Sequence, residues 1–269
     1  MEIWSVYEES LGQKASLSSS KVMPMVVLDL GTGTGGTLRG LAHCALERGQ
    51  DLSNARLIGI DISQQMLLRA EKRTSELGSA ESVEWVLGDA TDLLARPELS
   101  GLQHQVDLLI FADGGFSLLK ELEGIDKFFS QVALFLRPGT GRVFLEVYDY
   151  SEQPEAKYDP SLPEADYEGG FKETEELCKK GIIPFTIQEL KSDNHFEDGY
   201  YFENLTAKVV TKDSQGKETI LEVVEYKTKS KIWKADELVQ QAKKAGLEST
   251  EVKEIGVFRF FTFRVPGEY

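Results

Sequence analysis

The sequence predicts an α/β fold in which helices cover both faces of a parallel sheet and an antiparallel layer is inserted. Three observations support this prediction. Apolar runs alternate with amphipathic segments up to about residue 148, the alternation stops over about residues 150–230, and it resumes near Ile232. The first pattern is typical of βαβ units, whereas runs that alternate polar and apolar residues are typical of antiparallel strands.

The core elements follow from the hydrophobic pattern in chain order. Residues 17–21 precede the first apolar run and indicate a linker. The first part is predicted as strand 26–30, helix 36–48, strand 56–61, helix 63–77, strand 83–87, strand 106–111, helix 121–135 and strand 142–148. After the insertion come helix 235–245, which ends at Gly246, and strands 248–254 and 257–265, so the sheet has seven strands.

The inserted segment begins with a proline-rich, acidic stretch that indicates a loop or hinge. A charged helix is expected near residues 171–180. Three strand-like runs follow at 184–190, 200–211 and 218–230, and a hairpin signal at 213–216 joins the last two. We therefore expect a core of residues 1–149 and 231–269 and an inserted antiparallel β cap of residues 150–230.

The first strand ends in a glycine-spaced turn, D-L-G-T-G-T-G-G, that leads into a predicted helix. Gly31, Gly33 and Gly35 allow main-chain N–H groups to close on a ligand at the mouth of that helix. Gly31, Gly33 and Gly36 also satisfy the G-x-G-x-x-G pattern of dinucleotide sites. Asp29 favours a different ligand, because a carboxylate repels a pyrophosphate and attracts an amino group.

Carboxylates recur where the next predicted strands end. Asp61 ends the second strand, Asp89 follows the third, and Asp113 follows the fourth. Open α/β sheets bind ligands at the carboxyl ends of their strands. Asp61 can accept hydrogen bonds from both hydroxyls of a ribose, and Asp89 can accept one from the exocyclic amine of a purine.

These motifs resemble those of the class I S-adenosylmethionine-dependent methyltransferases. The similar segments are D-L-G-T-G-T-G at 29–35, G-I-D-I-S at 59–63 with Met66, Leu67 and Ala70 behind it, G-D-A at 88–90, and L-R-P-G-T-G-R at 136–142 before V-F-L-E. The resemblance implies a Rossmann-like sheet, S-adenosylmethionine as methyl donor and S-adenosylhomocysteine as product. The donor-binding residues that it implies are Asp29, Gly31, Thr32, Gly33, Gly35, Asp61, Ile62, Asp89, Ala90, Ala112 and Asp113.

In layout the chain resembles glycine-type and amino-sugar N-methyltransferases, whose cap walls off the acceptor. We therefore expect an enzyme that methylates oxygen or nitrogen of a small organic metabolite, with residues 150–230 binding the acceptor. His195, in this cap, is the candidate catalytic base, and Tyr148 is a candidate contact to acceptor or sulfonium. His43 and His104 are interpreted as structural or solvated.

The composition of the chain excludes several classes of binding partner. A formal net charge of −15 and a pI near 4.8 argue against a polyanionic nucleic-acid substrate. Cys44 and Cys178 lie far apart without a Cys/His cluster, so neither a disulfide framework nor a metal site is expected. Without a signal peptide or membrane span, we expect a cytoplasmic protein and no membrane partner. A monomer and a homodimer both remain open.

Two alternatives are kept. A natural-product cyclase or non-catalytic partner subunit could share the same fold, because a fold does not determine a reaction. A nicotinamide-dependent oxidoreductase remains a third interpretation through the glycine pattern that includes Gly36.

Overall fold

The computed structural model describes residues 2–17, 24–50, 52, 55–76, 83–119, 122–148, 185–212, 217–255 and 258–267. The chain divides into two compact units, Met1–Asp149 with Trp233–Tyr269, and Tyr150–Ile232. Each unit is described by itself.

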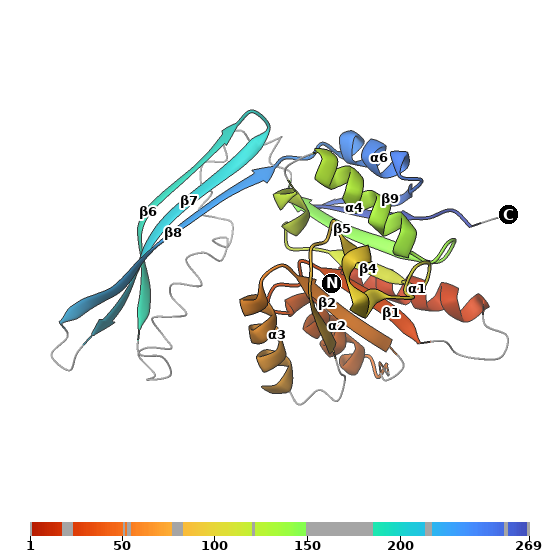
Figure 1. Ribbon diagram of the computed structural model, residues 1–269, viewed down its shortest axis with the longest axis horizontal. Helices are drawn as coiled ribbons and strands as arrows, with labels where there is room; N and C mark the ends of the chain where they lie inside the picture. The colour runs from red at the N-terminus through yellow and green to blue at the C-terminus, as the bar shows by residue number, and fades with distance from the viewer. Residues whose placement is uncertain are drawn as a thin grey trace. The chain divides into compact units, whose positions relative to one another are not determined.

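The first unit contains a seven-stranded sheet in the order β3-β2-β1-β4-β5-β10-β9 (Figure 1). The first five strands in the chain run parallel, whereas β10 is antiparallel to both of its neighbours. The strands are β1 (Met25–Leu30), β2 (Ala55–Asp61), β3 (Val83–Leu87), β4 (Leu108–Phe111), β5 (Arg142–Tyr148), β9 (Glu248–Ile255) and β10 (Phe258–Arg264). The α/β prediction, with its seven strands, is confirmed.

Two apolar cores lie on opposite faces of this sheet. Leu28 and Leu30 of β1 face one core, which includes α4 (Leu122–Phe135) and α6 (Ala235–Lys244). Val27, the residue between them, faces the other core, which includes α1 (Glu2–Leu17) and α2 (Gly36–Glu47). Because successive side chains of a strand point to opposite faces, a strand buried on both sides reads as a continuous apolar run. Helix α3 (Gln64–Glu76) lies against β2 and β3.

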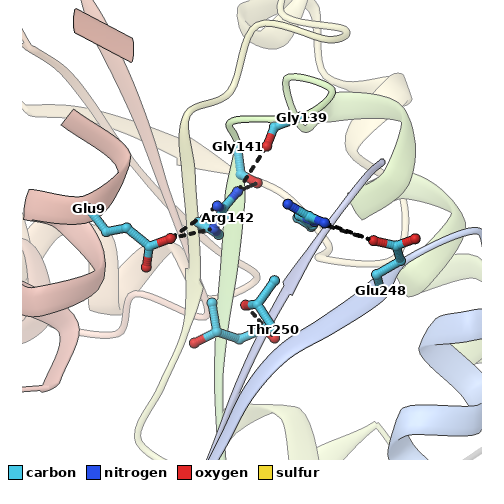
Figure 2. Close-up of polar contacts among 8 residues, drawn as sticks. Glu9, Gly139, Gly141, Arg142, Glu248 and Thr250 are labelled. Atoms are coloured by element: carbon cyan, nitrogen blue, oxygen red, sulfur yellow. Dashed lines mark hydrogen bonds and ion pairs between the residues drawn. The ribbon is translucent and has the colours of Figure 1, made fainter. Parts of the chain in front are cut away.

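Helix α1 was not predicted from the sequence. Its Trp4 and Tyr7 side chains are almost completely buried against the sheet. Arg142, at the start of β5, is also buried. Its guanidinium donates to the Glu9 carboxylate of α1 at 3.0 Å and to the carbonyls of Gly139 and Gly141 (Figure 2). Helices in proteins gain most of their stability from such tertiary contacts, which a local sequence pattern does not reveal.

The second unit contains an antiparallel sheet in the order β6-β7-β8, formed by β6 (Thr186–Glu197), β7 (Tyr200–Lys212) and β8 (Glu218–Lys231). Strand β6 is longer than predicted, because it pairs with β7 up to the turn at Asp198 and Gly199. Both turn residues have positive φ, as a two-residue hairpin of this type requires. The predicted proline-rich hinge, the helix near 171–180 and the hairpin signal at 213–216 lie outside the described residues.

Three short 3-10 helices complete the described elements, at Leu93–Ala95, Pro97–Leu99 and η3 (Gly115–Leu118). Strand β4 begins two residues later than predicted, since Val106 forms a single bridge with Leu136 instead of joining the ladder. Within the described part of the chain, no helix is long and apolar enough to cross a membrane.

Candidate functional site

Strand β1 marks the point where the strand order reverses. It pairs with β2 on one side and β4 on the other, so the connections after β1 and β4 lead away from each other. Open α/β sheets bind their ligands outside the carboxyl ends of the strands at such a point. The glycine-rich turn that follows β1 lies at this edge.

The three alternate glycines of this turn all have left-handed backbone conformations, with φ of 61° at Gly31, 54° at Gly33 and 75° at Gly35. A β-carbon at Gly31 would lie 2.8 Å from the Phe111 ring, and one at Gly35 would lie 2.6 Å from the Trp85 ring. A β-carbon at Gly33 would meet nothing within 4 Å. Packing therefore requires glycine at the outer two positions, whereas Gly33 borders open space, as expected where a ligand approaches the backbone.

Asp29 is buried at the end of β1, with 1% of its surface exposed. Thr32 donates its hydroxyl to the Asp29 carboxylate at 2.5 Å. Burial raises the pKa of Asp29 to about 7, and the charges of Asp113 and Asp61 act in the same direction. A buried carboxylate of this kind is stabilised when a cationic group pairs with it.

Asp61 connects the end of β2 to the glycine turn. One carboxylate oxygen accepts the N–H of Gly33 at 2.8 Å, and the other accepts the N–H of Ser63 at 2.8 Å. Each oxygen keeps a second lone pair, so two acceptor positions remain for a diol. The adjacent Ile62 side chain is 75% exposed, an apolar surface suited to the face of a purine.

The third predicted carboxylate lies at the end of the neighbouring strand. Gly88 N–H donates to the Asp61 carbonyl at 3.0 Å, which joins the ends of β2 and β3. Asp89 is exposed and accepts from the N–H and the hydroxyl of Thr91. Ala90 is buried. Asp89 thus caps a local turn, and its predicted contact with an adenine amine stays a prediction.

The turn after β4 brings a further carboxylate to this edge. Ala112 is buried, whereas Asp113 is exposed and has a φ of 54°, unusual for a residue other than glycine. Glu146, on β5, is close enough to Asp113 for the two charges to interact. Burial and the nearby Asp113 charge raise the pKa of Glu146. Glu146 was not among the predicted site residues, because a single glutamate in an apolar strand resembles an ordinary solvent-facing position.

The predicted catalytic residues lie on different elements. Tyr148 ends β5, where its backbone pairs with Phe258. His195 lies within β6, exposed, and stacks on the Phe202 ring of β7 with centroids 5.0 Å apart. Its catalytic role stays a prediction. His43 lies 3.6 Å from Glu47 on the exposed face of α2.

Comparison with known proteins identifies relatives of this chain. Residues 27–139 match a methyltransferase domain. N-methyltransferase FrzE from Cladobotryum sp is 27% identical over 99% of this chain and 90% of its own length. An S-adenosylmethionine-dependent methyltransferase structure from Clostridium acetobutylicum has a TM-score of 0.59 at 13% identity, covering 98% of this chain and 92% of that chain. The structure of the sugar N-methyltransferase KedS8 from Streptoalloteichus sp has a TM-score of 0.57 at 14% identity. That match covers 97% of this chain and 87% of that chain.

At such low identity the structural likeness shows the fold, whereas the domain match and the full-length relative show the activity. These two matches show that the ligand of the glycine turn is S-adenosylmethionine and not a nicotinamide dinucleotide. Residues 27–139 are thus a methyltransferase domain, and over its full length the chain is similar to S-adenosylmethionine-dependent methyltransferases.

Proposed function

We propose that this protein transfers a methyl group from S-adenosylmethionine to a nitrogen atom of a small organic acceptor. The observation that carries the proposal is the carboxylate-rich edge of the sheet. Asp29 lies near the end of β1, Asp61 ends β2, Asp113 follows β4, and Glu146 lies near the end of β5. Such an edge favours cationic groups over anionic ones. The relatives named as N-methyltransferases support the choice of nitrogen.

The residues at this edge fit the donor. Asp29 would pair with the amino group of its methionine part, the N–H groups beside Gly33 would meet its carboxylate, and Asp61 would accept from its ribose hydroxyls. Ile62 would lie against the adenine. When bound, the donor supplies a methyl group that its sulfonium already activates. The chain then has to hold the acceptor in line and close, which can contribute about 7–11 kcal/mol.

An acceptor nitrogen needs a free lone pair, so a protonated amine must lose its proton before transfer. We assign acceptor binding to the inserted cap, residues 150–230, and proton removal to His195, whose side chain is exposed in β6. Tyr148, the last residue of β5, is our candidate for an acceptor contact from the core. The cap's separation into its own compact unit supports a distinct role for it.

Asp29 makes donor binding and stability depend on pH. In the free protein its pKa is about 7, and an ammonium group beside it would favour the carboxylate. Donor affinity should therefore rise about fivefold between pH 6 and pH 7. Between pH 3.8 and about 7 the folded protein binds more protons at Asp29 than the unfolded chain, so stability falls as the pH rises through that window.

Asp29→Asn removes both effects. The variant should unfold at a higher temperature than the wild type near pH 8, show no such gain near pH 4, and lose the pH dependence of donor affinity. Thermal unfolding and calorimetric titration at several pH values test this. An unchanged pH profile of donor binding would contradict the assignment of Asp29.

Asp61→Ala should weaken donor binding roughly tenfold to a hundredfold, because it removes charge-assisted hydrogen bonds. It also releases the Gly33 N–H. Asp61→Asn keeps one acceptor oxygen and should fall between the alanine variant and the wild type. Calorimetric titration with the donor measures both variants. Wild-type affinity in Asp61→Ala would remove the residue from the donor site.

The choice of nitrogen is tested with matched acceptors. The protein is incubated with methyl-labelled donor and pairs of small molecules that differ only in an amine or a hydroxyl at one position. Mass spectrometry should show the labelled methyl group on amines. Labelling of the hydroxyl partners alone would overturn the choice of nitrogen and leave the methyltransferase activity intact.

A further inference from the structure

Strand β8 forms one edge of the three-stranded sheet in the second unit (Figure 1). It is 14 residues long and, among the described strands, pairs only with β7. Residues 218–227 are all exposed, and since successive side chains of a strand point to opposite faces, neither face of this stretch is covered. The outer edge of such a strand presents N–H and C=O groups that can pair with a further strand.

The exposed part of β8 is also apolar. Five of its large apolar side chains are between 40% and 58% exposed: Ile220, Leu221, Val223, Val224 and Tyr226. Proteins usually keep an exposed edge short, charged or covered, because it otherwise recruits another strand. The pairing with β7 skips Leu221, so the regular part of the edge runs from Glu222 to Lys231.

The charges of β8 indicate which strand fits this edge. Its glutamates precede its lysines along the strand, in the order Glu218, Glu222, Glu225, Lys227, Lys229 and Lys231. When two copies of one strand pair antiparallel, the first part of each copy lies against the last part of the other. The acidic part of β8 is therefore complementary to the basic part of β8 in a second copy.

One register of this pairing places opposite charges directly opposite each other. In a symmetric antiparallel pair, opposite residues share a face of the sheet, and the symmetry axis lies between the two copies of one residue. With the axis at Tyr226, Glu225 of each copy lies opposite Lys227 of the other. An axis at Glu225 or at Lys227 would place that residue opposite its own copy, and like charges directly opposite destabilise a sheet.

The two charged residues already pair within one chain. Lys227 Nζ lies 2.9 Å from the Glu225 carboxylate, and both side chains are more than half exposed. Two such pairs side by side form a group of four alternating charges, so each charge gains a second neighbour of opposite sign. On the other face of the sheet, the two Tyr226 rings lie directly opposite each other as a cross-strand aromatic pair.

The exposed edge of the first sheet is not complementary to itself in this way. Strand β9 carries Glu248, Glu251 and Glu254 but a single lysine, Lys253. Two copies of β9 would bring acidic strands together in a protein whose net charge is −15. Self-pairing is therefore favoured at β8 and disfavoured at β9.

We propose that this protein forms a homodimer in which β8 pairs antiparallel with β8 of a second copy, with the symmetry axis at Tyr226. The pairing joins the two antiparallel sheets into one continuous sheet and satisfies the outer edge of β8. It is independent of the methyl-transfer reaction.

Reversal and exchange of the two charges test this register. Glu225→Lys gives four positive charges around the axis, and Lys227→Glu gives four negative ones, so each should weaken the dimer at least about tenfold. The double variant Glu225→Lys with Lys227→Glu alternates in charge again and should dimerise like the wild type. An equimolar mixture of the two single variants should also dimerise. Glu251→Lys, on the edge strand β9, is the matched control and should leave the dimer unchanged.

Sedimentation equilibrium at several protein concentrations measures the dimer, and the wild type should approach twice the chain mass of 30.1 kDa. Amide hydrogens of residues 222–230 should exchange more slowly at concentrations where the dimer forms. Circular dichroism verifies folding. A wild type that stays monomeric overturns the proposal, as does a dimer that neither single variant weakens or a double variant as weak as the single ones. If one single variant does not fold, an unweakened dimer in the other overturns it.

Discussion

Gly33→Val should leave a folded protein that binds S-adenosylmethionine at least about a hundredfold more weakly. Two effects combine. The valine side chain would occupy the open space above the turn, where a β-carbon at Gly33 has no neighbour within 4 Å. The backbone φ of 54° is also unfavourable for a β-branched residue. The Gly33 N–H that Asp61 accepts remains available, so the turn keeps that bond.

The matched control is Gly36→Ala. Gly36 is the first residue of α2, a β-carbon there also meets nothing within 4 Å, and its φ is not positive. This variant should bind donor like the wild type and unfold at a similar temperature or slightly above it. Circular dichroism verifies folding, and calorimetric titration measures affinity. Retained affinity in Gly33→Val would mean that the turn has only a structural role.

His195→Ala should lower turnover about a hundredfold or more and leave donor affinity nearly unchanged. An imidazole is the side chain best suited to proton removal close to neutral pH. The loss should be partly rescued at higher pH, where the acceptor amine deprotonates without a base. The stacking on Phe202 is lost as well, but His195 itself is exposed and Phe202 is only half-buried.

The control for this prediction is His43→Ala. His43 is also exposed, and its neighbour Glu47 lies on the same helix, so its loss should not affect turnover. Initial rates over a range of pH values, measured with an acceptor amine that the wild type methylates, compare the two variants. Wild-type turnover in His195→Ala at neutral pH would exclude the residue as the catalytic base.

The sequence determined the order and type of most core elements, because strands buried on both faces and helices buried on one face differ in hydrophobic period. The predicted bounds of β3 and β5 agree with the structure, and those of β1, β2 and α2 differ by one residue. Helix α1 was missed, because its stability comes from contacts such as Arg142 with Glu9, which are 133 residues apart in the chain.

For the site, the positions of Asp29, the alternate glycines and Asp61 predicted a ligand-binding edge, because the carboxyl ends of neighbouring parallel strands meet at one edge of the sheet. The donor itself was predicted from the resemblance of these motifs to those of methyltransferases. Only the tertiary structure distinguished Gly33 from Gly31 and Gly35, since the rings that exclude a β-carbon belong to Phe111 and Trp85 on other strands. It also decided the burial of Asp29 and the closeness of Asp113 to Glu146. Both depend on residues that the fold brings together across the sheet, and a local sequence pattern does not show which residues of different strands become neighbours.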